Sequence, residues 1–309
     1  MKSLLNSTIK SIHWKEYLLL VISMFFWGLS WPLTKILVSY ATSFQLGFFR
    51  FLIAGVIFLC IFFIRYRKQN KVYSWQTWFQ FGILGLLGIF GYGILFLTAM
   101  RFTTSAQGAV IAGIQPAMIS ILAGLIHHER LQPAWRYWGL LFSFLGVILI
   151  IGIQPFLNFN RDHFIGNLIV VIAFLCFASY SVYGKTVMQS NDSYETTTWA
   201  TVIGMGLFAM SAVVENKWAE VQLNHEFLWV GIIILGVGTT VIAFFSYFYA
   251  INRIGATKTG IFINLVPVFG TLTSVWLLNE QLTWTLWVGM ILISIGIGFI
   301  NFPRNSNSK

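Results

Sequence analysis

Long apolar segments separated by short polar loops follow one another along the whole chain. Each approaches the length of about 20 apolar residues that crosses a hydrocarbon core. Spanning segments are helices or closed barrels, because lipid offers backbone amides no partners. These segments lack the alternation of barrel strands. We therefore expect an all-α integral membrane protein with ten transmembrane helices at residues 17–40, 44–64, 75–99, 103–127, 135–153, 164–188, 196–214, 227–251, 256–278 and 284–302.

Composition agrees with this pattern. The chain is 57% hydrophobic and only 9% charged, whereas a soluble domain has about 25% charged residues. We interpret the net charge of +10 as loop charge that sets topology, so no nucleic-acid partner is expected. Cys60 and Cys176 lie inside apolar segments and are interpreted as packing residues rather than a disulfide.

The segment Ala99–Leu131 has a counterpart at Ala250–Leu282. Four residue pairs share one offset of 151 residues: Ala99 and Ala250, Pro116 and Pro267, Glu129 and Glu280, Leu131 and Leu282. An internal repeat of this length indicates duplication. The expected domain plan is a cytoplasmic N-terminal segment (1–16), a first five-helix repeat (17–153), a linker (154–163), a second five-helix repeat (164–302) and a cytoplasmic tail (303–309).

Basic residues orient the chain. With both termini inside, only five of the 19 Lys and Arg residues fall toward the outer side, which leaves 14 on the inner side. The five are Lys35, Arg50, Arg101, Arg161 and Lys217. Because each repeat has an odd number of spans, the second enters the membrane upside down. Inverted repeats around a central cavity are typical of secondary transporters.

Two matched prolines are candidate hinges. Pro116 frees the carbonyl of Ala112, and Pro267 frees that of Ile263. The alternative is an ordinary kink. The glycine series of the third span (Gly82, Gly85, Gly88, Gly91 and Gly93) favours close helix packing over a direct role in the substrate path.

Charged residues inside spans are costly and point to function. Lys35 and Arg50 are candidates to hold a carboxylate, with snorkelling to the interface as the alternative. Snorkelling is favoured for Lys185 and Lys258. All nine acidic residues lie in loops or at span ends, as do the histidines, so no carboxylate proton relay is expected. Glu129 and Glu280 are interpreted as capping or ion-pairing residues.

Aromatic and amide side chains on several spans are the candidate cavity lining. Together with Lys35 and Arg50 the predicted substrate-binding set is Trp27, Trp31, Tyr92, Phe96, Gln107, Gln115, Tyr180, Tyr183, Phe244, Tyr247 and Asn264. Singly, each is interpreted as packing; as a set they suit a small, partly apolar solute with polar groups. Metal-ligand spacings, phosphate loops and nucleophile–base arrangements are absent. The sequence therefore predicts no enzyme, no metal site and no cofactor.

The chain resembles the EamA-type members of the drug/metabolite transporter superfamily. The resemblance rests on FFWGLSWPLTK (Phe25–Lys35) and on the Ala–Pro–Glu–x–Leu pattern of both repeated segments. It implies a ten-helix fold with a central cavity and export of amino acids or related metabolites across the inner membrane, with the bilayer as partner. The sixth span, FASYSVYGK (Phe177–Lys185), lacks the Trp–Gly pair, so an asymmetric site is expected. A monomer is expected, with an oligomer as the alternative.

The leading hypothesis is a transporter of amino acids or similar zwitterions working by alternating access. Three other transport hypotheses stay open: a cationic-drug exporter, an exchanger of nucleoside-like metabolites such as S-adenosylmethionine, and a lipid-linked sugar flippase. A membrane receptor or scaffold is the alternative without transport, and the repeats disfavour it.

Overall fold

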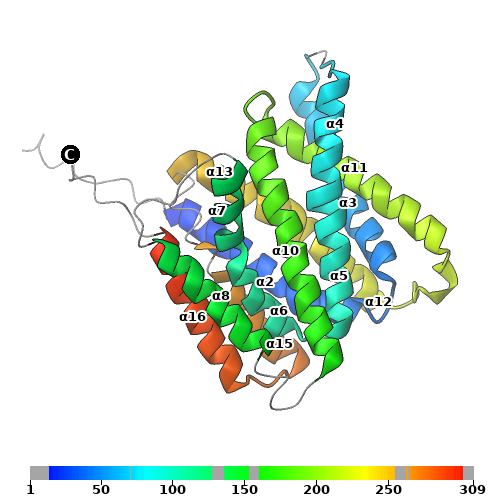
Figure 1. The fold of residues 1–309 in the computed structure, drawn as a ribbon. Helices are drawn as coiled ribbons and strands as arrows, with labels where there is room; N and C mark the ends of the chain where they lie inside the picture. Colours follow the sequence, from blue (N-terminus) through cyan, green and yellow to red (C-terminus); the bar gives the residue numbers. More distant parts are fainter. Residues whose placement is uncertain are drawn as a thin grey trace, which may run out of the picture.

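Helices account for all regular elements in the described part of the chain (Figure 1). The computed structural model describes residues 14–69, 71–126, 136–152, 160–254, 262, 263 and 265–301. In chain order the elements are α2 (Trp14–Leu37), α3 (Ser43–Tyr66), α4 (Trp75–Leu84), η1 (Gly85–Gly91), α5 (Tyr92–Phe102), α6 (Ser105–Ile111), η2 (Ala112–Ile114), α7 (Gln115–Ile126), α8 (Arg136–Gly152), α10 (Arg161–Val187), α11 (Ser193–Glu215), η3 (Trp218–Glu220), α12 (Glu226–Ile233), η4 (Ile234–Ile242), α13 (Ala243–Ile254), α15 (Leu265–Leu278) and α16 (Trp284–Asn301).

Seven of the described helices are long and apolar enough to cross a membrane, judged by length and composition. Three shorter apolar helices accompany them: Tyr137–Gly146, Leu265–Leu278 and Trp284–Gly296. Helix content thus confirms the all-α, multi-pass membrane class. The count of ten spans and the inverted arrangement stay predictions.

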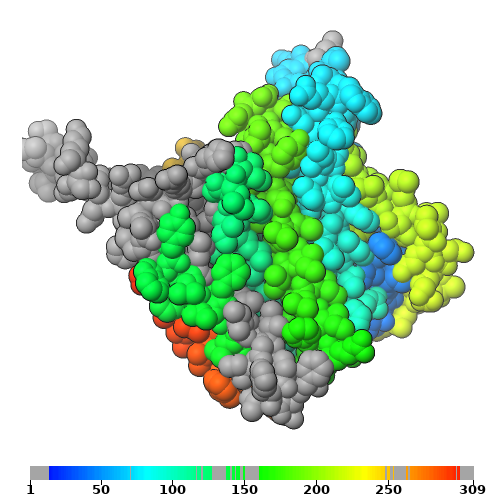
Figure 2. Space-filling view, viewed as in Figure 1, coloured from blue at the N-terminus to red at the C-terminus, as the bar shows by residue number. Residues whose placement is uncertain are grey.

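The helix contacts correspond between the two halves of the chain. α2 packs on α13 and α15, while α10 packs on α5 and α7. Similarly, α3 packs on η4, while α11 packs on η1. α3 also packs on α11, and α8 lies along α16 at one edge of the molecule, which Figure 2 shows as green against orange-red. Each of these contacts therefore joins an element of one half to an element of the other.

Small residues let three of these helices approach closely. A Cβ on Gly28 of α2 would lie 2.5 Å from the Cβ of Phe269 in α15. A Cβ on Gly270 would lie 2.5 Å from that of Ala109 in α6. Without a hydrophobic driving force between helices in lipid, such backbone approach increases the van der Waals contact that holds them together.

Both repeated prolines are preceded by a tighter turn. The Ala112 carbonyl, which Pro116 leaves without its α-helical donor, accepts from the N–H of Gln115 in the 3₁₀ turn η2. The Ile263 carbonyl, four residues before Pro267, accepts from the N–H of Val266 at 2.9 Å. A 3₁₀ bond is a common way to satisfy such freed groups inside a membrane helix. Hinge motion at these sites stays a prediction.

Two π-helical segments, η1 and η4, interrupt the third span of each half. π-helical turns are rare and are frequently found at functional sites. η1 contains Gly85, Gly88 and Gly91, and η4 contains Gly236 and Gly238. These segments place glycines where α11 and α3 pass closely.

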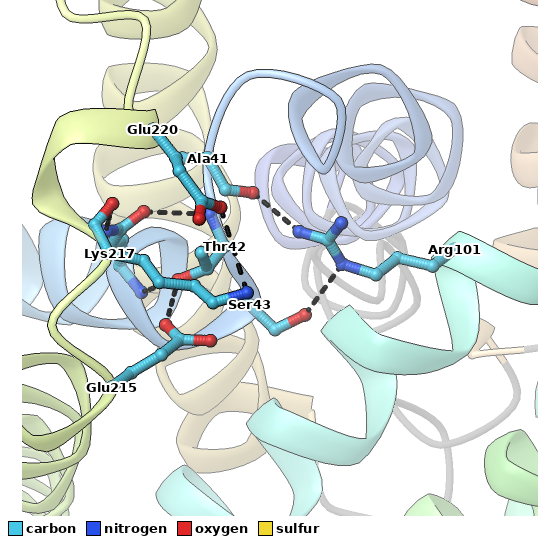
Figure 3. Close-up of polar contacts among 8 residues, drawn as sticks. Ala41, Thr42, Ser43, Arg101, Glu215, Lys217 and Glu220 are labelled. Atoms are coloured by element: carbon cyan, nitrogen blue, oxygen red, sulfur yellow. Dashed lines mark hydrogen bonds and ion pairs between the residues drawn. The ribbon is translucent and has the colours of Figure 1, made fainter.

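One end of the bundle is joined by the Glu215 cluster, which we define as Ala41, Thr42, Ser43, Gln45, Arg101, Glu215, Lys217 and Glu220 (Figure 3). Thr42 caps α3 and donates its hydroxyl to Glu215 Oε2 at 2.5 Å. Gln45 Nε2 donates to the Lys217 carbonyl at 2.9 Å. Arg101 Nη2 donates to the Ala41 carbonyl at 2.7 Å. The cluster links the loops after α2 and α11 to the end of α5.

Glu280 closes the same end from another side. Its Oε1 accepts from the N–H of Ser105 and its Oε2 from that of Ala106, both at 2.8 Å. The carboxylate thereby satisfies two free amides at the positive end of α6. The capping role predicted for Glu280 is confirmed, whereas Glu129 lies outside the described residues.

The Glu195 pairs, defined as Arg65–Asp192 and Lys71–Glu195, join the opposite end of α3 and α11. Arg65 Nη2 lies 3.7 Å from Asp192 Oδ2, with both side chains largely exposed. Lys71 Nζ pairs with Glu195, whose side chain is only 3% exposed. The hydrogen bond to Glu195 is the main cause that raises the pKa of Lys71 above its ordinary value of 10.5.

We expect Glu280→Gln to lower the midpoint of thermal unfolding in detergent, because one of the two α6 amides loses its acceptor. Loss of a helix cap costs about 1 kcal/mol. Glu226→Gln, an exposed residue in the first turn of α12, is the matched control. Equal midpoints for the two variants would contradict the capping role.

We expect the Lys71–Glu195 pair to stabilise the fold at neutral pH and to lose that effect as the pH rises. A lysine whose folded pKa is raised contributes stability below its unfolded pKa of 10.5, and this contribution is lost as the pH rises through the folded pKa. Thermal midpoints measured from roughly pH 8 to about pH 11, where lysine amines begin to deprotonate, should fall more steeply for the parent than for Lys71→Met. Lys68→Met, an exposed neighbour, should keep the parent's slope.

Candidate functional site

A cavity lies among α3, η1, α5, α10, α11 and the η4–α13 segment. It has a volume of about 40 Å³, room for a few water molecules. Its lining consists of Arg50, Phe51, Phe58, Gly88, Ile89, Tyr92, Phe177, Tyr180, Thr197, Thr201, Thr240 and Phe244. Six of these twelve side chains are aromatic and one carries a charge, so the cavity is an apolar chamber with a single cationic group.

Arg50 is that cation, and it is 9% exposed. Its Nε donates to Thr240 Oγ1 and its Nη2 to Thr239 Oγ1, each at 3.3 Å. The guanidinium carbon also lies 5.1 Å from the centre of the Phe51 ring, within the range of a cation–π contact. Among the described residues no carboxylate pairs with it. Since a buried charge is costly unless paired, Arg50 is set to receive an anionic group.

Aromatic rings surround the chamber in two groups. Tyr92 contacts Phe177 at a centroid distance of 5.2 Å, and Phe177 contacts Tyr180 at 5.7 Å. On the other side, Trp27 lies 5.3 Å from Phe244 and 5.2 Å from Tyr247. Rings in such edge and tilted contacts form a stiff apolar wall.

Some of the predicted residues come together here. Arg50, Tyr92, Tyr180 and Phe244 line the cavity. Trp27 contacts the lining residue Phe244, and Tyr247 contacts Trp27. Phe96 stacks on the lining residue Tyr92, and Trp31 contacts Phe96.

Other predicted residues lie elsewhere. Lys35 donates to the Thr103 carbonyl at 2.7 Å, near the end of the bundle that Glu280 caps. Gln107 accepts from Asn167 at 3.1 Å in the same buried polar region. Tyr183 packs in a separate apolar cluster with Phe81 and Leu84.

Two candidates of the predicted set remain. Gln115 is half-buried at the start of α7. Asn264 lies outside the described residues, as does Lys258, for which snorkelling is the prediction. Whether any residue of the predicted set contacts substrate stays a prediction.

The threonines of the lining were not among the residues predicted from the sequence. Three lining threonines donate their hydroxyl to a backbone carbonyl of their own helix: Thr197 and Thr201 of α11 and Thr240 of η4. A hydroxyl satisfied in this way costs little in lipid, so these threonines are not conspicuous within apolar spans. The signal that could have found them is the pair Thr239–Thr240 in an otherwise apolar segment, ILGVGTTVI.

Comparison with known proteins decides the family. The model of the EamA-like transporter family matches twice, at residues 14–152 and 164–302. The chain belongs to the EamA-like transporter family. It is thus a multi-pass membrane transporter. The names of the family and of the relatives described next are those of transporters, not of enzymes.

Relatives of this EamA-like transporter support the assignment. The uncharacterized transporter YyaM of Bacillus subtilis is 27% identical over 96% of this chain and 98% of its own length. The aromatic amino acid exporter YddG of Ancylobacter novellus is 24% identical over 64% of this chain and 66% of its own. A solved crystal structure, 18% identical, matches with a TM-score of 0.63 over 92% of this chain and 96% of that one, which shows the same fold.

We expect Gly88→Ala to lower the thermal midpoint of this transporter, because its Cβ would lie 2.2 Å from the Tyr180 ring across the cavity wall. Gly82→Ala, on the same span with no atom within 4 Å, is the matched control. It should be neutral or stabilising, since alanine favours a helix by about 0.5–1 kcal/mol over glycine. A loss of stability in Gly82→Ala as large as in Gly88→Ala would count against this contact.

Proposed function

We propose that this EamA-like transporter moves amino acids with apolar or aromatic side chains, or similar carboxylate-bearing zwitterions, out of the cell by alternating access. The single observation that carries the proposal is Arg50, a buried guanidinium without a carboxylate partner among the described residues, on the wall of an aromatic chamber. Arginine binds a planar carboxylate through two parallel hydrogen bonds. The substrate carboxylate would supply the missing counter-charge.

The rest of the lining supports the apolar part of the substrate. Phe51, Phe58, Phe177 and Phe244 have no polar atom beyond the backbone, whereas Tyr92 and Tyr180 add a hydroxyl each. Such a wall favours a side chain that is large and apolar. The distant relative that exports aromatic amino acids agrees with this preference.

The lining disfavours two other transport hypotheses. A cationic drug would meet the positive charge of Arg50 and no carboxylate among the lining residues. A lipid-linked sugar would place many hydroxyl groups against six aromatic rings. S-adenosylmethionine keeps a carboxylate and an aromatic base, so it belongs in the test panel.

Transport in this proposal uses two inverted five-helix repeats, one in each segment that the family model matches. The cavity of about 40 Å³ is smaller than a ligand pocket, which has about 300–1,000 Å³, so the substrate enters only after the walls separate. Pro116 and Pro267 are the proposed hinges. The proposed location is the inner membrane with both termini in the cytoplasm.

The test is counterflow of labelled solutes into proteoliposomes, which needs no knowledge of a coupling ion. We expect L-phenylalanine and L-leucine to exchange more rapidly than amines that lack a carboxylate. Arg50→Gln should raise the KM for L-phenylalanine by about 100-fold, since hydrogen bonds to a charged group are worth about 1.5–3 kcal/mol.

Arg101→Gln is the matched control, because Arg101 is an arginine of the Glu215 cluster that lies outside the cavity. It should change stability but leave the KM close to the parent value. Arg50→Lys should recover only part of the affinity lost in Arg50→Gln. Lysine keeps the positive charge but lacks the two parallel N–H donors with which arginine binds a carboxylate. Faster exchange of an amine than of every carboxylate in the panel would overturn the proposal.

A further inference from the structure

We infer that Thr239 and Thr240 are positioning residues that orient the Arg50 guanidinium so that one of its edges faces the substrate carboxylate. The inference rests on the proposed function, in which Arg50 binds that carboxylate. It assigns the role to the π-helical segment η4, which contributes both threonines.

The two threonines engage one edge of the guanidinium and leave another open. Nε donates to Thr240 Oγ1 and Nη2 to Thr239 Oγ1, and these two nitrogens form the side edge of the planar group. Of the five N–H donors of arginine, both on Nη1 and one on Nη2 remain. Among the described residues none accepts from Nη1. One N–H of Nη1 and the remaining N–H of Nη2 form the end edge, which matches a carboxylate bidentately.

The direction of the threonine hydroxyls is fixed by a shared backbone acceptor. Both donate their single hydrogen to one carbonyl, that of Leu235, at 2.5 Å from Thr239 and 3.0 Å from Thr240. Each oxygen can therefore only accept from Arg50. The Leu235 carbonyl can accept from the residues four and five positions later because the turn has the wider spacing of a π-helix. This arrangement fixes two acceptors side by side.

Contacts with two neighbouring helices hold η4 in place. A Cβ on Gly236 would lie 3.1 Å from the Arg50 carbonyl oxygen and 3.0 Å from the Cβ of Ile53. The indole Nε1 of Trp27 donates to the Thr239 carbonyl at 3.0 Å. The threonines are thus placed by contacts with α3 and α2 rather than by the arginine alone.

The pair of η1 and α11, which corresponds to the pair of η4 and α3, provides an internal comparison. A Cβ on Gly85 of η1 would lie 2.8 Å from the Ala200 carbonyl oxygen and 3.1 Å from the Cβ of Ile203. Ala200 of α11 stands at the position that corresponds to Arg50 of α3, 150 residues earlier. The close approach of the two backbones therefore forms with alanine at this position as well. η1 (GLLGIFG) contains no hydroxyl side chain. Helix packing does not require the arginine or the threonines, so their presence in only one of these two helix pairs calls for another role.

The experiment compares two solutes in counterflow: L-phenylalanine and L-phenylalaninamide, which lacks only the carboxylate. We expect the double variant Thr239→Val, Thr240→Val to raise the KM for L-phenylalanine about tenfold, equal to about 1.4 kcal/mol. The KM for the amide should stay close to the parent value, because the amide has no carboxylate for Arg50 to bind. The double serine variant, which keeps both hydroxyls, should restore the parent value.

Thr273→Val is the matched control, because Thr273 is a buried threonine that donates to its own helix at Phe269 and does not line the cavity. It should change neither KM. An unchanged KM for L-phenylalanine in the double valine variant, or an equal rise for both solutes, would overturn the inference alone. If the parent and Arg50→Gln exchange L-phenylalanine with equal KM, or the parent exchanges neither solute, the proposed function fails and the inference with it.

Discussion

A hydrocarbon environment offers no hydrogen-bond partner, and the structure depends on satisfying backbone and charged groups from within the bundle. The carbonyl freed by Pro116 accepts a hydrogen bond from the N–H of Gln115. The amides at the start of α6 donate to the Glu280 carboxylate. The hydroxyls of η4 donate to the carbonyl of Leu235. Where such compensation is complete, the element is rigid and carries no further information about ligands. Arg50 differs from these groups because it is a buried charge whose hydrogen bonding is incomplete.

The two halves share a backbone arrangement and differ in the side chains placed on it. Gly85 meets Ala200 as Gly236 meets Arg50. The packed pair of α3 and η4 thereby supplies the guanidinium of Arg50 and the hydroxyl of Thr240, whereas Ile89 of η1 and Phe177 of α10 supply apolar surface. A solute with a polar end and an apolar end matches such a chamber in one orientation, whereas a symmetric chamber would bind it equally in two.

The membrane class followed directly from the sequence, because apolar run length is set by the bilayer and needs no tertiary information. Arg50, Tyr92, Tyr180 and Phe244 were also anticipated, since charged and aromatic residues inside spans are conspicuous. Lys35 shows the limit of that reasoning: it is as unusual in sequence as Arg50, yet its amine reaches the Thr103 carbonyl near one end of the bundle. The depth of a side chain and the helix it faces depend on packing. The π geometry of η4, which brings two threonines to one carbonyl, has no signature in apolar periodicity.

The two ends of the α3–α11 pair carry related contacts with different electrostatics. Thr42 and Gln45 begin α3, and Asp192 and Glu195 begin α11 150 residues later. The partners diverged too, for Glu215 faces Thr42 where Arg65 faces Asp192. Exposed ion pairs weaken with salt, whose screening length is about 8 Å at physiological strength, whereas hydrogen bonds to a hydroxyl or a backbone carbonyl depend on it far less. Duplication followed by divergence has thus left the contacts between α3 and α11 responsive to the ionic composition of the surrounding solution at one end. They are far less so at the other end, where the exposed Lys217–Glu220 pair lies within a single loop.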